Sequence, residues 1–184
     1  MPGKRAILGG QSGQGIADVD PVARGLVVMG EIHHMIHRGL MFSASYFTEG
    51  IADDASLNIL VVTAADQVAH MRFEVAAGGL AEILLYESVT TSADGTAIAA
   101  YNRRRSSLGT AVTAISHTPT VSDLGTRLLQ GMLPGGEGGH AVGGVAFSFS
   151  EWVLKSDTKY LLRVTNRSGQ AQAIGADINF YEPE

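Results

Sequence analysis

Cysteine is absent from this chain of 184 residues. Without thiols the protein forms no disulfide, no zinc–thiolate site and no thiol nucleophile, which excludes a disulfide-dense secreted fold and cysteine-dependent catalysis. Charge is also scarce, because charged residues make up 17% of the chain, where about 25% is typical of soluble domains. A composition this poor in charge indicates that part of the surface is hidden against a partner.

Lysine is nearly absent as well, with 3 lysines against 10 arginines. Arginine is the more weakly hydrated cation and is enriched at protein interfaces, where lysine is depleted. A bias of the genome toward GC would produce the same imbalance, and both explanations stay open. Because hydrophobic residues reach 45% and the mean hydropathy is +0.13, we expect an oligomer or a component of a larger assembly.

Long apolar runs are missing too. The run LNILVVTAA (57–65) has the length of a strand, far short of the about 20 residues that a membrane-spanning helix needs. Lys4 and Arg5 are followed by AILGG, which is too short for the apolar core of a signal peptide. The net charge of −5 and the pI of about 5.6 disfavour nucleic acid as the main partner. We therefore expect no membrane partner and no direct contact with nucleic acid.

The first 30 residues differ from the rest of the chain. They are rich in glycine, contain the run GGQSGQG, and show no helical or strand periodicity. One interpretation is a disordered tail, and the other is an extended arm that orders on a partner. The apolar Ile7, Leu8 and Ile16 give such an arm something to bury. We predict an N-terminal arm over residues 1–30 and one domain over residues 31–184.

Most of that domain has the pattern of short strands. In HMRFEV, the apolar Met71, Phe73 and Val75 alternate with polar residues, which is the period of a half-buried strand. Similar segments are LMFSASYF (40–47), VAFSFS (145–150), YLLRVTN (160–166) and DINFYE (177–182). By contrast, LNILVV (57–62) and LAEILLYE (80–87) are apolar on both faces, which predicts strands that lie between the core and a neighbour.

Turn signals separate these segments. Asp-Gly in SADGTA (92–97) and the run NRSGQ (166–170) predict turns. The best helix candidate is SDLGTRLLQGML (122–133), although its glycines weaken it. About nine or ten strands with turns between them predict an antiparallel all-β sandwich. The long irregular connection at 118–144 favours a Greek-key jelly roll over an up-and-down meander.

Three of the six histidines fall within five residues, at His33, His34 and His37. We place them on a strand, where His33 and His37 share a face. A cupin-type metal site needs a His-x-His pair, a nearby glutamate and a third histidine, whereas this chain offers HHMIH, a distant Glu49 and His70. A cupin-like metalloenzyme stays open as an alternative. We expect instead that these histidines pack and form hydrogen bonds, with no metal and no cofactor.

The sequence shows no recognisable catalytic constellation, and we predict that the protein is not an enzyme. The Gly-x-Ser-x-Gly elbow of serine hydrolases is absent, and the carboxylates are scattered. The stretch PGGEGGHAVGG (134–144) lacks the lysine of a phosphate loop and precedes a strand, which indicates a mobile loop whose tip is exposed or awaits a partner. In NRRRSS (102–107), Arg103, Arg104 and Arg105 are predicted to pair with carboxylates of a neighbouring subunit or to lie in solvent.

Three strings occur in a specific order: IHHMIHRGLMFSASY (32–46), LLYESVTTSADGTAIAAYNRRRSS (84–107) and EWVLKSDTKYLLRVTNRSG (151–169). Together they resemble a group of small virion proteins of tailed bacteriophages, the capsid decoration or cement proteins, usually encoded close to the major capsid protein. The resemblance covers about residues 31–182. One departure is that a second asparagine is expected beside the arginine where this chain has Asn102 followed by three arginines.

The resemblance implies a jelly-roll protein on the exterior of an icosahedral phage head, often a homotrimer at symmetry axes. It would clamp neighbouring major capsid subunits, because a ligand that binds only the assembled shell stabilises that shell. The alternative is a receptor- or glycan-binding virion module, such as a head fibre or a tail-tip jelly roll. The candidate capsid or subunit interface residues are Lys4, Arg5, Ile7, Leu8, Ile16, Arg103, Arg104 and Arg105.

Overall fold

The computed structural model of the chain describes residues 6–10, 13–17, 30–106, 109–135, 147–148 and 150–183. By its contacts the chain divides into two compact units, Met1–His34 and Met35–Glu184. In the first unit, β1 (Ala6–Gly10) and β2 (Gly13–Ala17) pair as an antiparallel hairpin. The sequence shows no strand period over these residues, and the extended arm over residues 1–30 stays a prediction. Glycine occupies four of the ten positions of these two strands, so the sequence shows no alternating side-chain pattern there.

The histidine-rich segment is a helix, α1 (Glu31–Arg38), and its prediction as a strand is wrong. The physical reason is the spacing of Ile32, Met35 and Ile36, which places the apolar side chains on one helical face. Gly39 ends the helix with a φ of 76°. Its N–H donates to the Ile36 carbonyl oxygen and the N–H of Leu40 to that of Met35, both at 3.0 Å. These two bonds form the Schellman motif that commonly closes a helix.

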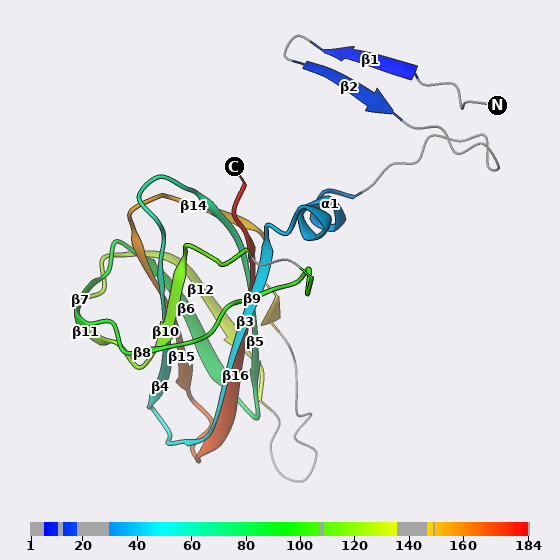
Figure 1. Cartoon of the computed structure of the whole chain (residues 1–184). Coiled ribbons are helices and arrows are strands. Elements are labelled where there is room, and N and C mark those ends of the chain that lie inside the picture. The colour runs from blue at the N-terminus through cyan, green and yellow to red at the C-terminus, as the bar shows by residue number, and fades with distance from the viewer. Residues whose placement is uncertain are drawn as a thin grey trace. The chain divides into compact units, whose positions relative to one another are not determined.

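Two antiparallel sheets of six strands each build the second unit (Figure 1). The first sheet has the order β13-β5-β16-β3-β9, with β14 also paired to β5, and its strands are β3 (Met41–Ile51), β5 (Ala69–Ala77), β9 (Tyr101–Asn102), β13 (Phe147–Ser148), β14 (Trp152–Leu154) and β16 (Gln172–Tyr181). The second sheet has the order β12-β6-β15-β4-β10-β8, with β4 (Ser56–Val62), β6 (Ala81–Glu87), β8 (Thr96–Ala97), β10 (Ala114–His117), β12 (Thr126–Leu133) and β15 (Lys159–Asn166).

The two sheets pack face to face over one hydrophobic core. Every second residue of β5 is buried, including Met71, Phe73 and Val75, as the alternating sequence predicts. The rings of Phe42 and Phe180, on neighbouring strands, stack at 5.5 Å in the same core. The predicted antiparallel all-β sandwich is confirmed. Its jelly-roll connectivity stays a prediction.

A two-stranded ribbon, β7 (Thr90–Ala93) and β11 (Thr120–Asp123), adds a third layer (Figure 1). On the outer face of the second sheet, Leu60 and Leu161 are buried together with Val89, next to Val121 of the ribbon. The strands that are apolar on both faces are thus covered, at this point, by a segment of their own chain. The structure also corrects the helix predicted at 122–133, which instead forms parts of β11 and β12.

Two similar segments build this ribbon, TTSADGT (90–96) and TVSDLGT (120–126). A serine hydroxyl of each segment donates to a threonine carbonyl oxygen of the other, Ser92 to Thr120 at 3.5 Å and Ser122 to Thr90 at 3.1 Å. The two segments then cross, since the end of the first pairs as β8 with β10 and the end of the second pairs as β12 with β6. The ribbon therefore consists of two similar turning segments, here called corners, which are joined by reciprocal hydrogen bonds.

Each corner turns at a glycine with a positive φ, Gly95 at 87° and Gly125 at 63°. A Cβ on Gly95 would lie 2.2 Å from the carbonyl oxygen of His117, and one on Gly125 would lie 2.2 Å from that of Glu87. No side chain fits at such a separation, so both corners require glycine on steric as well as conformational grounds. The turn predicted at SADGTA is confirmed.

Candidate functional site

The outer face of the first sheet carries ordered rows of side chains that run across its strands. One row joins Ser45 of β3 to Asp177 of β16 and Glu74 of β5. The rows on either side of it are Ser43–Asn179–Arg72 and Phe47–Gly175–Ala76. Odd-numbered residues of β3 reach this face because the even-numbered Phe42 and Ala44 point into the core. The face therefore combines serines, carboxylates and one large apolar side chain.

A polar hollow of about 310 Å³ opens on this face. Its lining consists of Ser43, Ala44, Ser45, Glu74, Tyr101, Arg103, Asp177 and Asn179. The hollow exists because β3 contributes only small side chains there, while Tyr101 on the edge strand β9 is large and 60% exposed. Concave sites with a few converging polar groups are where proteins commonly bind ligands or partner side chains.

Two carboxylates of the hollow face each other across the sheet. Glu74 and Asp177 are direct cross-strand partners and both are exposed. Like charges in this position destabilise a sheet unless a cation lies near them. Within the described residues, neither carboxylate has an ion pair, and the nearby Arg72 bonds Glu151 instead. The pair therefore brings two negative charges into the hollow, where Arg103 is the cation of the lining.

Phe47 borders a second, apolar hollow on the same face. Its side chain is 61% exposed and its ring lies over Gly175, where a Cβ would meet the ring at 3.5 Å. This hollow has about 160 Å³ and is lined by Phe47, Ala76, Ala77, Gly78, Ala173 and Gly175. The polar hollow, lined by Ser45, and the apolar hollow, lined by Phe47, thus lie in adjacent rows of this face.

The loop after β9 is fixed by a buried asparagine. Asn102 donates from its Nδ2 to the carbonyl oxygen of Gly39 (2.6 Å) and to that of Gly109 (3.3 Å). Its Oδ1 accepts the backbone N–H of Arg104 at 2.9 Å. Asn102 therefore ties the loop both to itself and to the end of α1, which makes it a structural residue.

The structure gives each predicted arginine of this loop a different position. Arg104 donates from Nη1 to the His37 carbonyl oxygen at the C-terminal end of α1 (2.5 Å). The helix dipole stabilises a cation at this end. Arg105 lies over the ring of Tyr101, 5.6 Å from its centroid. Arg103 lines the polar hollow. Pairing of these arginines with a neighbouring subunit stays a prediction.

The other predicted interface residues belong to the arm. Ile7 of β1 is the register partner of Ile16 of β2, and Leu8 is that of Gly15. Lys4 and Arg5 lie outside the described residues. The first 30 residues therefore offer backbone pairing within the hairpin, and their role in attachment stays a prediction.

The histidines take separate positions. His33 and His37 are one helical turn apart on α1, whereas His70 of β5 lies on the first sheet, where its Nδ1 is 3.0 Å from Oε1 of Glu151 and its ring stacks on that of Tyr181. The hydrogen bond from His70 holds the pKa of Glu151 below its usual range. Across the residues that the structure describes, no three His, Asp or Glu side chains gather closely enough to hold a metal ion.

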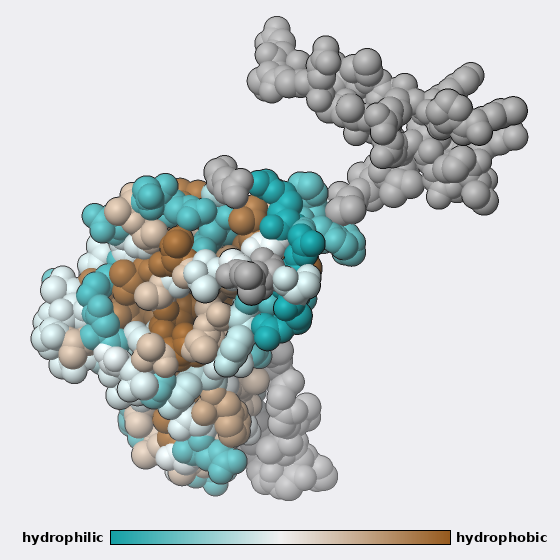
Figure 2. Space-filling model, viewed as in Figure 1, coloured by the Kyte–Doolittle hydropathy of each residue, from teal (hydrophilic) through white to brown (hydrophobic). Residues whose placement is uncertain are grey.

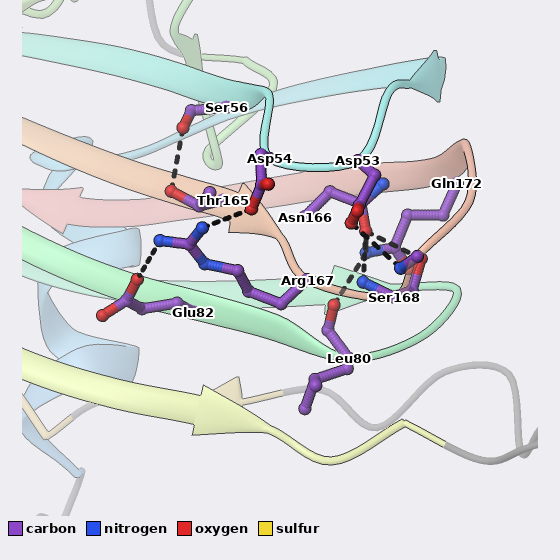
Figure 3. Close-up of polar contacts among 11 residues, drawn as sticks. Asp53, Asp54, Ser56, Leu80, Glu82, Thr165, Asn166, Arg167, Ser168 and Gln172 are labelled. Carbon is purple, nitrogen blue, oxygen red and sulfur yellow. Dashed lines mark hydrogen bonds and ion pairs between the residues drawn. The ribbon is translucent and has the colours of Figure 1, made fainter.

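Several residues of the strings that carry the resemblance prove to be structural. Asn166, in the predicted NRSGQ turn, donates to the carbonyl oxygens of Ile51 (2.8 Å) and Gln170 (2.7 Å). Its Oδ1 accepts from Ser168 and, at 2.7 Å, from the buried Gln172 (Figure 3). The amide therefore joins both sheets at this end of the sandwich.

Charged side chains close the same end. Arg167 forms ion pairs with Asp54 and, at 3.0 Å, with Glu82 (Figure 3). Its hydrogen bond to Glu82 lowers the pKa of that carboxyl. Arg163 of β15 lies over the ring of Tyr86 of β6, 6.0 Å from its centroid. These contacts support the fold and leave the outer face of the first sheet as the candidate site.

No protein-family model matches the chain, and no curated protein matches it. No helix in the described part of the chain has the length and apolarity needed to cross a bilayer.

Proposed function

We propose that this protein is a structural virion protein, a capsid decoration or cement protein that binds the outside of a phage head and clamps neighbouring major capsid subunits. The observation that carries the proposal is the number of large apolar side chains that the sandwich leaves in solvent. Each is more than half exposed: Phe47, Tyr101, Val112, Met132 and Val153. They lie on strands of both sheets and beside β10, so the protein offers apolar contacts to more than one neighbour.

Two further features support this role. Figure 2 shows an apolar region over β10. Ala114, the first residue of β10, and Val112, which precedes the strand, are exposed. Apolar regions of this kind on a folded protein often mark interaction sites. In addition, the consecutive strands β3, β4, β5 and β6 alternate between the two sheets, and β16 lies between β3 and β5. This order supports the jelly roll that the resemblance implies.

The proposal includes a homotrimer, and the fold narrows the surfaces that can form it. The apolar residues on the outer face of the second sheet are partly covered by the ribbon β7–β11. A subunit contact is therefore expected on the first sheet or at β10. Sedimentation at micromolar concentration should show a species above the 19.3 kDa monomer, either alone or once capsid shells are added.

The decisive experiment is the analysis of particles from the phage that encodes this chain. Quantitative mass spectrometry should find the protein at a fixed ratio to the major capsid protein. Gold-labelled antibodies raised against it should bind intact heads, and removing the gene should lower the temperature at which heads release DNA. Absence from particles, or labelling of the tail tip alone, would contradict the cement role.

One observation favours the alternative of a glycan-binding virion module. Tyr101 presents an exposed ring beside Asp177 and Asn179 in the polar hollow, and a flat ring beside hydrogen-bonding groups suits a sugar. A glycan array probed with the purified protein tests this alternative. Binding that Tyr101→Ala abolishes would favour it over the cement role.

A further inference from the structure

Strand β3 extends well beyond its neighbour on one side. Against β16 it is paired along most of its length, from Met41 to Ile51. On its other side, β9 pairs only with Phe42 and Ser43. The chain before β9 has already left β3, since the N–H of Ile98 donates to Ile115 in the second sheet (2.8 Å). Figure 1 shows β3 continuing past β9 as the margin of its sheet.

The backbone groups that point outward from this edge can be identified. The carbonyl oxygen of Met41 accepts the N–H of Arg103 at 2.8 Å, so Met41 points toward β9. Because the direction alternates along a strand, Ser45, Phe47 and Glu49 point the same way. Within the described residues, the N–H and C=O groups of these three have no ladder partner on that side.

Natural proteins usually protect such an edge. Short edge strands, charges, proline and bulges keep other chains from pairing with it. Here the free segment carries one charge, Glu49, and ends beside a register shift against β16, but it also presents Phe47, whose side chain is 61% exposed. On the outer face, the side chain of Ser45 lines the polar hollow and that of Phe47 lines the apolar one. Free backbone groups and open hollows therefore coincide.

We propose that the β3 edge from Ser45 to Glu49 binds an extended segment of a partner protein as an added antiparallel strand. The segment carries an apolar side chain opposite Phe47 and an arginine or lysine opposite Ser45, in the order apolar-x-basic. An antiparallel direction follows from the rest of the sheet, in which β3 pairs antiparallel with both neighbours. The proposal rests on the proposed function only for the partner's identity, a capsid subunit.

The charge of the site selects the basic residue. Opposite Ser45, a long side chain can lie over the small serine toward Asp177 and Glu74, whose charges lack a partner in the described structure. The distance to Asp177 is about 10 Å, or two strand spacings, which suits an arginine. Glu49 adds a third negative charge on the edge. Arg103 lines the same hollow, but among the described residues its guanidinium forms no ion pair with Glu74 or Asp177.

This mode of recognition divides the work between two kinds of contact. Backbone hydrogen bonds to an exposed edge give affinity, while alternate side chains in pockets give specificity. Phe47 of the apolar hollow and Ser45 of the polar hollow are two residues apart on β3 and lie on one face. This is the spacing of alternate side chains on an added strand. The site therefore selects the side chains at two positions of the bound segment, those opposite Phe47 and Ser45.

The test is an NMR titration of the full chain with the peptide SKTVTRS, blocked at both ends. Its valine and arginine are placed to lie opposite Phe47 and Ser45. We expect the amide signals of Ser45, Phe47 and Glu49 to shift together with a single dissociation constant. Replacing the peptide's arginine by glutamate should weaken binding by about tenfold or more, as the loss of a close charge pair predicts.

Two N-methylated peptides provide the matched control. A methyl group on the valine nitrogen removes a hydrogen bond to β3 and should abolish the shifts. The same group on the following threonine, whose N–H points away from β3, should leave the dissociation constant within about twofold, because that N–H bonds only solvent. Equal binding of both methylated peptides, or no binding of the unmodified peptide at millimolar concentration, overturns the proposal.

Variants of the protein test the two hollows separately. Asp177→Asn and Phe47→Ser should each weaken binding of the peptide by several-fold. Asp66→Asn makes an equal charge change elsewhere on the surface and should leave the affinity unchanged. Sugar binding that Tyr101→Ala abolishes, without peptide binding, would assign the hollow to a glycan. Self-association that Ser45→Pro removes would assign the edge to a second copy. Failure of the peptide with the protein still present on phage heads would refute this inference and leave the proposed function standing.

Discussion

The hydroxyl of Tyr160 donates a hydrogen bond of 3.0 Å to the carboxylate of Glu87, its cross-strand partner on β6. Burial raises the pKa of Tyr160 to about 12 from 10.0, and the bond to Glu87 acts in the same direction. A pKa raised by folding stabilises the protein below pH 10.0, and this stability is lost as the pH rises through 12. We expect the free energy of unfolding to fall over this range.

Urea unfolding between pH 8 and 12 measures this effect. Tyr160→Phe should lower stability at neutral pH, because the backbone N–H of Lys155, which donates to the Tyr160 oxygen at 2.9 Å, loses its acceptor. The variant should also show a smaller decline above pH 10. Tyr101→Phe, at an exposed ring, is the control and should keep the full decline. An identical slope in both variants would contradict the role of Tyr160.

The two glycines of the matching corners should be equally intolerant of a side chain. Gly95→Ala and Gly125→Ala each place a Cβ 2.2 Å from a carbonyl oxygen. We expect each to cost about 3 kcal/mol or more in unfolding free energy, the sum of left-handed strain and overpacking. Gly50→Ala is the control, since its φ of 71° is similar but nothing lies within 4 Å. It should cost only about 1 kcal/mol, and a loss as large as that at the corners would refute the steric argument.

Asn166 should be among the most sensitive polar positions of the protein. Asn166→Ala removes the bonds to Ile51, Gln170 and Gln172 and leaves buried groups without partners. Each buried orphan costs about 1–3 kcal/mol, so we expect a loss of about 3 kcal/mol or more in chemical denaturation. Ser168→Ala, which removes one hydroxyl of the same turn, should cost less than about 1 kcal/mol. Comparable losses would show that the amide is not the centre of the network.

The arm should be separable from the sandwich. A chain that starts at Glu31 lacks β1 and β2 but keeps α1 and every strand of the two six-stranded sheets. We expect it to retain the circular dichroism and the unfolding midpoint of the full chain. Under the proposed function it should bind phage heads more weakly. Unfolding of the truncated chain would place the arm within the folding unit.

The histidines of α1 are expected to bind no metal. Protein purified without chelators or an affinity tag should contain well under one zinc, iron or manganese ion per chain by elemental analysis. His33→Asn together with His37→Asn should change stability only modestly, because both side chains are exposed on α1. A stoichiometric metal that the double variant loses would bring back the cupin-like alternative.

The sequence predicted the strands of the core better than the connections between them. Alternating residues such as Met71, Phe73 and Val75 show which face is buried, and β5 follows that pattern. The histidine segment is a helix rather than the predicted strand, because Ile32, Met35 and Ile36 share one face only at the helical period. The run 122–133 differs in the opposite direction. Its leucines predict a weak helix, but pairing with β6 makes most of the run a strand.

The candidate site could not be predicted in the same way. Ser45, Phe47, Glu74 and Asp177 are unremarkable in the sequence, and only the register of β3, β16 and β5 places them in adjacent rows. The open edge of β3 depends on where β9 ends, which no local pattern reveals. The repeated TTSADGT and TVSDLGT segments were a signal that could have been found, because their serines, glycines and threonines match at one fixed offset.

The sequence by itself determined that this protein is an all-β sandwich, because apolar residues at alternate positions show that one face of each strand is buried. It also predicted the turn at Gly95, whereas the turn at Gly125 falls within the segment predicted as a helix. Tertiary structure alone decided which strands are edges and which apolar face is covered. Those outcomes depend on pairing between segments far apart in the chain, as when Val89 and Val121 meet Leu60 and Leu161. A local pattern shows that a strand face needs cover, but only the assembled fold shows what covers it.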